Sequence, residues 1–330
     1  MTLPFRTYPL PNLIAHADWG SNPRKRWMAQ ACLSNDGRYL AHAPEPVGEA
    51  QSLLQRLRET ASPQGAVLAG FDFPIGLPAR YAERAGIQDF LALLPQLGQG
   101  AWVDFYDVAE TPDQVSLGRP FYPNHPGQAK QSHLLHGLGV DALDDLRRLC
   151  ERARPGRRAA SPLFWTLGGQ QVGKAAIHGW REVLGPVLRG GAAFKSPQTL
   201  FIWPFSGRLY ELFKPGAVVV AETYPAEFYT HLGVTFSPHR AGARSGKRVR
   251  SHRAANAATL FAWAERAGVA LEPGLEAAFR DGFGMAPDGD DPFDAAVGLL
   301  GMLNVVLGYR PAGEPEAEII RRVEGWILGQ

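Results

Sequence analysis

The sequence predicts an α/β protein whose sheet begins as a three-stranded antiparallel meander. Short, mostly apolar runs at 13–17, 27–33 and 39–42 indicate three strands, and Ser34-Asn35-Asp36-Gly37 is a strong turn signal between the second and the third. Residues 49–58 then show helical spacing, with three leucines on one face. The apolar run 66–71 that follows predicts a strand parallel to the first.

This order of elements is the opening topology of the ribonuclease H-like fold. We therefore expect one ribonuclease H-like domain over residues 12–330, with a mixed five-stranded sheet. Residues 79–215 are rich in proline, glycine and aromatic residues, which predicts a mainly helical and loop insertion into that core. The expected helical pieces of the insertion are 143–154 and 175–188. After it, the core resumes with a strand at 218–221 and helices at 254–267, 292–307 and 314–328.

Composition sets limits on the class of protein. Hydrophobic residues make up 45% of the 330, which is enough for a large core and excludes global disorder. The formal net charge is only +2, so overall charge does not indicate a nucleic-acid binder. Cys32 and Cys150 form no disulfide or zinc pattern, and no apolar run approaches the roughly 20 residues of a membrane span. We expect a cytoplasmic protein without a membrane partner.

Three of the predicted strands end in an acidic residue that a chain-breaking segment follows. These residues are Asp18, Asp72 and Glu222. Ligands bind outside the carboxyl ends of the strands in open α/β sheets, so these side chains should crowd into one crevice. Each of them alone could equally be a helix cap or a turn former. As a set they would repel one another unless a cation neutralised them, and their hard oxygen ligands suit Mg²⁺ or Mn²⁺.

A further pair of acids lies at the start of the predicted helix 292–307. Pro292 suits a first helical turn, so Asp291 should lie near the cap and Asp294 inside the first turn. Residues three apart share a helix face, so both carboxylates can point the same way. We expect Asp294 to face the cleft, with Asp291 as its partner or as a cap.

Four segments of the chain carry a family resemblance. In order they read ADWG, GFDFPIGLP, ETYPAEFY and DDPFDAAVGLL, and together they resemble the DUF429 family of predicted ribonuclease H-like nucleases. The resemblance covers about 13–80 and 216–307. It implies that Asp18 is the metal-anchoring aspartate of the first strand, that Asp72 belongs to the D-x-P-x-G-x-P segment and Glu222 to E-x-Y-P. Asp294 resembles the last-helix aspartate of Holliday-junction-resolvase-like members, with Asp291 one turn earlier.

The leading hypothesis for function is metal-dependent hydrolysis of a phosphodiester in a nucleic acid or nucleotide. Two metal ions can clamp the attacking and leaving oxygens, so no nucleophilic side chain is needed. Asp18 would bridge both ions, Asp72 and Glu222 would complete one coordination shell each, and Asp291 and Asp294 would hold the second ion.

Substrate contacts are expected from basic and aromatic side chains. The basic stretch 240–253 could bind phosphates, although it could also be a solvated loop. Its basic residues are Arg240, Arg244, Lys247, Arg248, Arg250 and Arg253. We name Lys247 and Arg250 as the contacts, and Lys174 from a glycine-rich helix start. Trp19 and Tyr224 could stack bases, whereas Phe228 is better explained as core.

Three competing hypotheses remain open. Residues 168–174 match G-x-x-x-x-G-K after a possible strand at 163–167, but Ala175 replaces the Ser or Thr that a phosphate loop uses for Mg²⁺. Asp18-Trp-Gly-Ser21 fits the first motif of sugar kinases and actin-like ATPases, yet Asp72 is followed by Phe-Pro. The protein could also be a non-catalytic nucleic-acid or nucleotide-binding module. His133 and His136, without a nearby cysteine, are a weak pattern for zinc.

Overall fold

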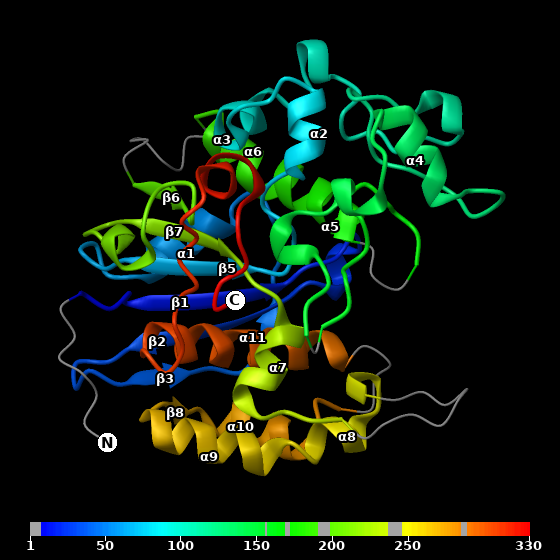
Figure 1. Ribbon diagram of the computed structural model, residues 1–330. Coiled ribbons are helices and arrows are strands. Elements are labelled where there is room, and N and C mark those ends of the chain that lie inside the picture. Colours follow the sequence, from blue (N-terminus) through cyan, green and yellow to red (C-terminus); the bar gives the residue numbers. More distant parts are fainter. Residues whose placement is uncertain (1–7, 156, 169–171, 191–198, 237–245, 285–288) are drawn as a thin grey trace.

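The computed structural model describes residues 8–155, 157–168, 172–190, 199–236, 246–284 and 289–330 (Figure 1). Over these residues the chain is an α/β protein with an eight-stranded mixed sheet, ordered β6-β7-β5-β1-β2-β3-β8, in which β4 also pairs with β2. The strands are β1 (Leu13–Asp18), β2 (Trp27–Leu33), β3 (Tyr39–Ala41), β4 (Glu45–Pro46), β5 (Val67–Phe71), β6 (Leu200–Ile202), β7 (Val218–Glu222) and β8 (Ala270–Leu271).

The predicted opening of the sheet is confirmed. β1 pairs antiparallel with β2 and β2 antiparallel with β3, whereas β1 pairs parallel with β5 and β5 parallel with β7. Gly37 turns the β2–β3 connection with a φ of 80°, a conformation that costs glycine little. The register places Ala17 opposite Phe71, and Phe71 opposite Glu222. The carboxyl ends of β1, β5 and β7 therefore lie at one edge of the sheet.

The sheet differs from the prediction at its margins. Eight strands occur among the described residues instead of five, because β4, β6 and β8 were not predicted. β6 lies inside the range 79–215 and pairs parallel with β7, so the end of that range belongs to the sheet. These three strands have two or three residues each. A run that short shows no period-two pattern from which a strand could be recognised.

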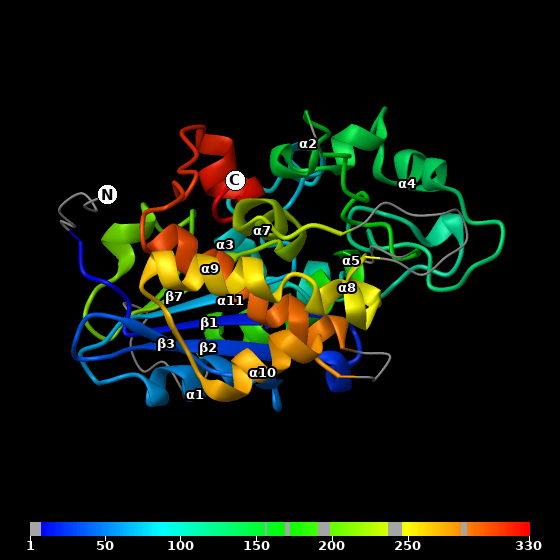
Figure 2. The ribbon, with the colours of Figure 1, turned by 90° about the horizontal axis from the view of Figure 1, so that it is seen from below.

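Helices cover both faces of the sheet (Figures 1 and 2). The helices before β6 are α1 (Leu53–Thr60), α2 (Ala79–Arg84), α3 (Phe90–Leu93), α4 (Gln131–Leu138), α5 (Val172–Gly179) and α6 (Gly185–Leu188). Those after β7 are α7 (Pro225–Leu232), α8 (Arg250–Ala254), α9 (Ala257–Ala267), α10 (Pro273–Asp281) and α11 (Asp290–Val306). In Figure 1, α2 to α6 lie above the sheet and α8 to α10 below it.

Several predicted helices change in extent or type. The helix expected at 254–267 is split into α8 and α9, and the first begins earlier, at Arg250. Residues 175–188 are helical as predicted, through α5, the π-helical turn η7 (Trp180–Leu184) and α6. The stretch 143–154 forms only the 3-10 turns η5 (Leu143–Leu146) and η6 (Leu149–Glu151). Of 314–328, the named helical element is the π-helical turn η10 (Ile320–Glu324), and Gly325, with a φ of 67°, ends it.

The sheet separates two hydrophobic cores. On one face α1 and the segments between β5 and β6 pack on alternate strand residues such as Ala15 and Ala69. On the other face α7, α9, α10 and α11 pack on Ile14, Leu68 and their neighbours. Helix α11 is buried from Pro292 to Val306, and Gly298 lets it approach β1 so closely that an added Cβ would lie 2.1 Å from the His16 ring. This close approach brings the start of α11 to the carboxyl end of β1.

No helix in the described part of the chain is long and apolar enough to cross a membrane.

Candidate functional site

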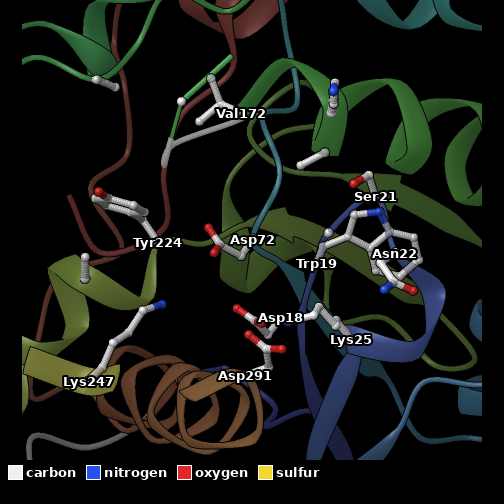
Figure 3. Close-up of a pocket in the computed structure, with 16 residues that line it drawn as sticks. Asp18, Trp19, Ser21, Asn22, Lys25, Asp72, Val172, Tyr224, Lys247 and Asp291 are labelled. Carbon is white, nitrogen blue, oxygen red and sulfur yellow. The ribbon is translucent and has the colours of Figure 1, made fainter. Parts of the chain in front are cut away.

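A cavity of about 690 Å³ opens at the carboxyl ends of β1 and β5, beside the first turn of α11 (Figure 3). Its described lining is acidic in the centre and basic at the margin. The lining residues include Asp18, Trp19, Gly20, Ser21, Asn22, Lys25, Asp72, Gly168, Val172, Lys174, Ala175, Tyr224, Lys247 and Asp291. We call it the acidic cavity. It contains most of the site residues that the sequence predicts.

The alternation of the strands explains why Asp18 and Asp72 meet there. Ile14 and His16 of β1 face α11, so Asp18, two residues further, faces the same way. In β5 the same face carries Leu68 and Gly70, followed by Asp72. Since Ala17 pairs with Phe71, the two aspartates end neighbouring parallel strands at the same level. Figure 3 shows both carboxylates pointing into the centre of the cavity.

Helix α11 supplies the other two acids, and Asp291 is the one of the two that lines the cavity. Asp291 lies in its first turn and lines the acidic cavity, close to Asp18 in Figure 3. Asp294 lies one turn deeper, is 1% exposed and does not line the cavity. It accepts hydrogen bonds from the Tyr229 hydroxyl and the Lys247 ammonium group. Asp294 thus lies behind Lys247 at the edge of the cavity, where its charge is the first of those that raise the pKa of Asp18.

Lys247 places one positive charge among these carboxylates. It follows the described 3-10 start at Gly246 and reaches into the cavity, where its ammonium group forms an ion pair with Asp294. Its pKa is raised above the ordinary value: burial lowers it, but Asp294, Asp18 and Asp72 outweigh burial. A lysine held by three separate carboxylates occupies a position where a cation is electrostatically favoured.

The acids raise one another's pKa values. Burial contributes most to the rise at Asp18, and the charges of Asp294, Asp72 and Asp291 add to it. The pKa of Asp72 rises to about 7, through burial and the charges of Asp294 and Glu222, against the opposing charge of Lys247. That of Asp291 rises to about 6, through burial and then Asp290. Lys247 alone leaves the cluster with an excess of negative charge that a further cation would relieve.

Glu222 does not join this cluster. It ends β7 in register with Phe71, one residue before the level of Asp72, so its side chain points to the face opposite α11. There Arg148 donates hydrogen bonds to both of its carboxylate oxygens, at 2.5 and 2.6 Å, and the Ile75 amide donates a third at 2.6 Å. The residue on the α11 face is Thr223, whose hydroxyl is 2.9 Å from His16 Nε2. The expectation that Glu222 shares the cleft is therefore wrong, because successive side chains of a strand point to opposite faces of the sheet.

Two observations bear on metal binding. Asp291 Oδ2 is buried and has no hydrogen-bond partner among the described residues. Asp18 and Asp72 accept no hydrogen bond through their side chains from another described residue, although both face the cavity. In the described part of the chain, no group of three or more His, Cys, Asp or Glu side chains is arranged so that it could hold a metal ion.

The predicted substrate contacts are distributed unevenly. Lys174, on the first turn of α5, and Tyr224 line the acidic cavity. Trp19 also borders it, but its ring is only 5% exposed and packs edge-on against Phe71 and Phe73, which makes it core rather than a stacking platform. Arg250 forms an ion pair with Asp281 and is not part of the cavity lining.

The other basic residues of the stretch 240–253 have different surroundings. Arg240 and Arg244 lie outside the described residues. Arg248 is exposed, whereas Arg253 is buried and donates hydrogen bonds to the Gly282 and Lys247 carbonyls. Phe228 is fully buried, as expected of a core residue. Among the described basic residues of this stretch, Lys247 is thus the one that lines the acidic cavity.

Sequence reasoning missed Lys25 and Asn22, which line the acidic cavity from the turn after β1, and Tyr229, which binds Asp294. Asn22 caps the 3-10 turn η1 (Pro23–Lys25) by accepting a hydrogen bond from the Arg24 amide. The sequence did indicate a turn here, because Asn22-Pro23 follows soon after the strand that ends at Asp18. A turn at this point keeps the chain close to the strand end. Tyr229 carried no comparable signal.

The structure also places the residues of the G-x-x-x-x-G-K match and the histidine pair. Residues 163–167 form a turn and not a strand, so no strand precedes the G-x-x-x-x-G-K match, and residues 169–171 of that match lie outside the described residues. Gly168, Val172 and Lys174 nevertheless line the acidic cavity. His133 Nδ1 is 2.9 Å from the Tyr122 hydroxyl, in a separate cavity that Lys130 and His125 also line.

No protein-family model, no curated protein and no solved structure matches the chain in comparisons with known proteins.

Proposed function

We propose that the protein is a divalent-metal-dependent nuclease that hydrolyses a phosphodiester in the acidic cavity. One observation carries this proposal: Asp18, Asp72 and Asp291 from three separate segments line one open cavity that lysines border. Carboxylates suit Mg²⁺ or Mn²⁺, and the lysines suit phosphate. The antiparallel meander followed by parallel β5 and β7 supports a ribonuclease H-like core, with residues 79–215 as an insertion that adds β6 to the sheet. Membership of the DUF429 family is part of this proposal and rests on the four sequence segments.

Two features of the donor set favour a divalent cation. Asp291 Oδ2 is a buried acceptor without a partner among the described residues, and Asp18 and Asp72 have raised pKa values that a cation would lower. Asp18, Asp72 and Asp291 would hold the metal, and Asp294 would join them if Lys247 moved away. Bound there, the metal would lower the pKa of a water molecule and neutralise charge that develops on the phosphate.

The chain's own cations would orient the substrate. Lys25, Lys174 and Lys247 all line the acidic cavity, and each ammonium group is of a type that binds a phosphate oxygen. Figure 3 shows Tyr224 and Lys247 on the side opposite Trp19 and Lys25, so a bound phosphate would lie between cations and above the aspartates. Glu222 acts indirectly in this proposal, because it is bound to Arg148 and fixes the end of β7 that positions Tyr224.

The first prediction concerns Asp18→Asn. Purified protein with Mn²⁺ or Mg²⁺ should cleave oligonucleotides, and EDTA should stop cleavage. Asp18→Asn should lower the cleavage rate by more than the roughly 10- to 100-fold that loss of an outer-sphere metal partner costs, because a direct ligand is removed. Asp113→Asn is the matched control: Asp113 is exposed, lies outside the acidic cavity and should leave the rate unchanged.

The assay should include single- and double-stranded DNA, RNA and short oligonucleotides, with gel separation of products. If the whole panel stays intact while anisotropy still detects binding, the protein is a binding module and the hydrolytic proposal fails.

A phosphotransferase is the second candidate. The turn from Asp18 to Ser21 lines the same cavity as Lys174, which is the arrangement that would face a nucleotide phosphate. ATP turnover that Asp18→Asn abolishes, with no cleavage of any oligonucleotide, would favour this candidate over the nuclease.

A further inference from the structure

A second cavity of about 570 Å³ adjoins the acidic cavity. The two share Ala160, Tyr224 and Ala226 in their linings, so they are continuous at the start of α7. The remaining lining of the second cavity consists of Arg154, Pro155, Arg157, Arg158, Ala159, Glu227, Thr230 and His231. We call it the arginine cavity. Neither the proposed metal chemistry nor the residues predicted from sequence account for it.

The arginine cavity has an excess of positive charge. In its described lining, Glu227 is the sole carboxylate, and Arg154 and Arg157 both form ion pairs with it. Arg158 is exposed and has no hydrogen bond or ion pair with another described residue. Burial lowers the pKa of Arg154 slightly from its ordinary value, and the positive charges of Arg157 and Arg310 lower it further. An anion bound here would relieve this crowding of cations.

Tyr224 lies between the two cavities. Its ring is partly buried, and the Arg157 guanidinium carbon lies 5.2 Å from the ring centroid in a cation–π contact. The ring borders the proposed metal ligands on one side and the arginines on the other. A ligand that fills both cavities must therefore carry negative charge at two separate points and pass over an aromatic ring.

We propose that the arginine cavity binds the backbone phosphates of a single-stranded nucleic acid whose next phosphate lies in the acidic cavity, so that one strand crosses Tyr224. This inference rests on the proposed function, because it takes the acidic cavity as the place of the scissile phosphate. A free phosphate or a mononucleotide would fill only one cavity. An unpaired base has an open face to stack on Tyr224, whereas the bases of a duplex are covered by their neighbours.

Arg158 provides a clean test, because no described contact depends on it and its removal leaves the fold and the metal ligands intact. Binding of fluorescein-labelled octathymidylate and octauridylate is measured by anisotropy in Ca²⁺, which also takes carboxylate oxygens. Arg158→Ala should weaken binding of at least one of the two roughly 3- to 10-fold, as expected when one phosphate contact is lost, and Arg158→Glu should weaken it more. Arg152→Ala is the matched control, since Arg152 is exposed in the same segment but does not line the cavity.

Two further measurements separate this inference from the proposed function. The slope of log affinity against log salt should fall by about 0.7 in Arg158→Ala, the value for one contact to a single strand. With Mn²⁺, hydrolysis of bis(4-nitrophenyl) phosphate, which fits in the acidic cavity alone, should be the same in Arg158→Ala and wild type.

The outcomes are distinct. Unchanged octanucleotide affinity in Arg158→Ala and Arg158→Glu, or no binding by wild type, overturns the strand proposal. Equal affinity for inorganic phosphate and the octanucleotide also overturns it, because a free anion would then suffice. Absence of hydrolysis with any substrate defeats the nuclease proposal but leaves strand binding supported if Arg158 controls affinity.

Discussion

Lys247 shows how a single residue makes the acidic cluster compatible with a folded protein. Asp294 is buried and charged groups are costly to bury without partners, yet Lys247 and Tyr229 both bind its carboxylate. The side chain of Lys247 is 40% exposed, so it can leave Asp294 without disturbing the core. Lys247 thus neutralises part of the charge that a metal ion would neutralise under the proposed function.

This leads to a prediction for Lys247→Met. In EDTA at pH 8 the free energy of unfolding should fall by about 1–3 kcal/mol, less than the 3–5 kcal/mol typical of a fully buried pair, because Lys247 is partly exposed. Mn²⁺ should restore more stability to Lys247→Met than to wild type, since metal and lysine oppose the same negative charge. Urea unfolding with and without Mn²⁺ measures both effects.

Arg248→Met serves as the control for this change. Arg248 is exposed and lies in the same 3-10 turn, η9 (Gly246–Arg248), so its loss should have little effect on stability. Equal Mn²⁺ stabilisation of Lys247→Met, Arg248→Met and wild type would show that the metal does not replace the lysine.

At the scale of elements, α11 is what places Asp291 and Asp294 under the strand ends. Gly298 faces His16 of β1, and Gly301 faces the Phe228 ring of α7. Both glycines lie within a helix that is buried along its length from Pro292. Glycine lowers helix propensity by about 1 kcal/mol relative to alanine, so its presence here indicates that close packing outweighs propensity.

Gly298→Ala should therefore destabilise the protein. The added Cβ would lie 2.1 Å from His16, and the ring cannot move freely because it is fully buried between Thr223 and the Ala295 carbonyl. We expect a loss of about 1–3 kcal/mol, the usual cost of overpacking, measured by thermal or urea unfolding. Gly274→Ala in α10 is the control, because its added Cβ makes only an ordinary contact at 3.7 Å and should be neutral or stabilising. Equal stability of both variants would contradict the packing argument.

The strands show which parts of the fold and of the site could be predicted from the sequence. The strands that begin at Leu13, Trp27, Val67 and Val218 are mostly apolar over four residues or more, and all four were predicted. Asp18 and Asp72 could be placed because each follows such a strand. Glu222 was placed on the wrong face, because the register of β5 and β7 together with the period of two decides its side. That register depends on long-range pairing, which a single sequence does not reveal.

The positions of Asp294 and of the arginine cavity were less accessible to prediction. The surroundings of Asp294 are set by tertiary contacts, because its two partners, Tyr229 and Lys247, come from distant segments. Arg154, Arg157 and Arg158 lie in an irregular segment of the range 79–215, and its docking beside α7 is a tertiary contact. Neither feature has a local pattern in the sequence.

At the scale of the whole molecule, Arg148 joins three parts of the chain that are distant in sequence. Its guanidinium group donates to Glu222 at the end of β7, to Glu151 within the 79–215 range, and to the Ile75 and Glu324 carbonyls. Glu324 in turn accepts hydrogen bonds from the Ala79 and Leu149 amides. This buried network fixes the C-terminal segment and the helical layer against the sheet, beside the strand that leads to Tyr224.

Arg148→Met is accordingly expected to be the most destabilising of the substitutions considered, because it leaves Glu222 and Glu151 buried without their common partner. Breaking a buried ion pair on one side typically costs about 3–5 kcal/mol, to be measured here by urea unfolding. The double variant Arg148→Met/Glu222→Gln should recover part of that loss, since one uncompensated charge is removed. Arg80→Met is the control, as its ion pair with Glu83 is exposed on both sides and contributes little. If the double variant were no more stable than Arg148→Met, the charge of Glu222 would not be what Arg148 balances, and the network would owe its stability to its backbone contacts instead.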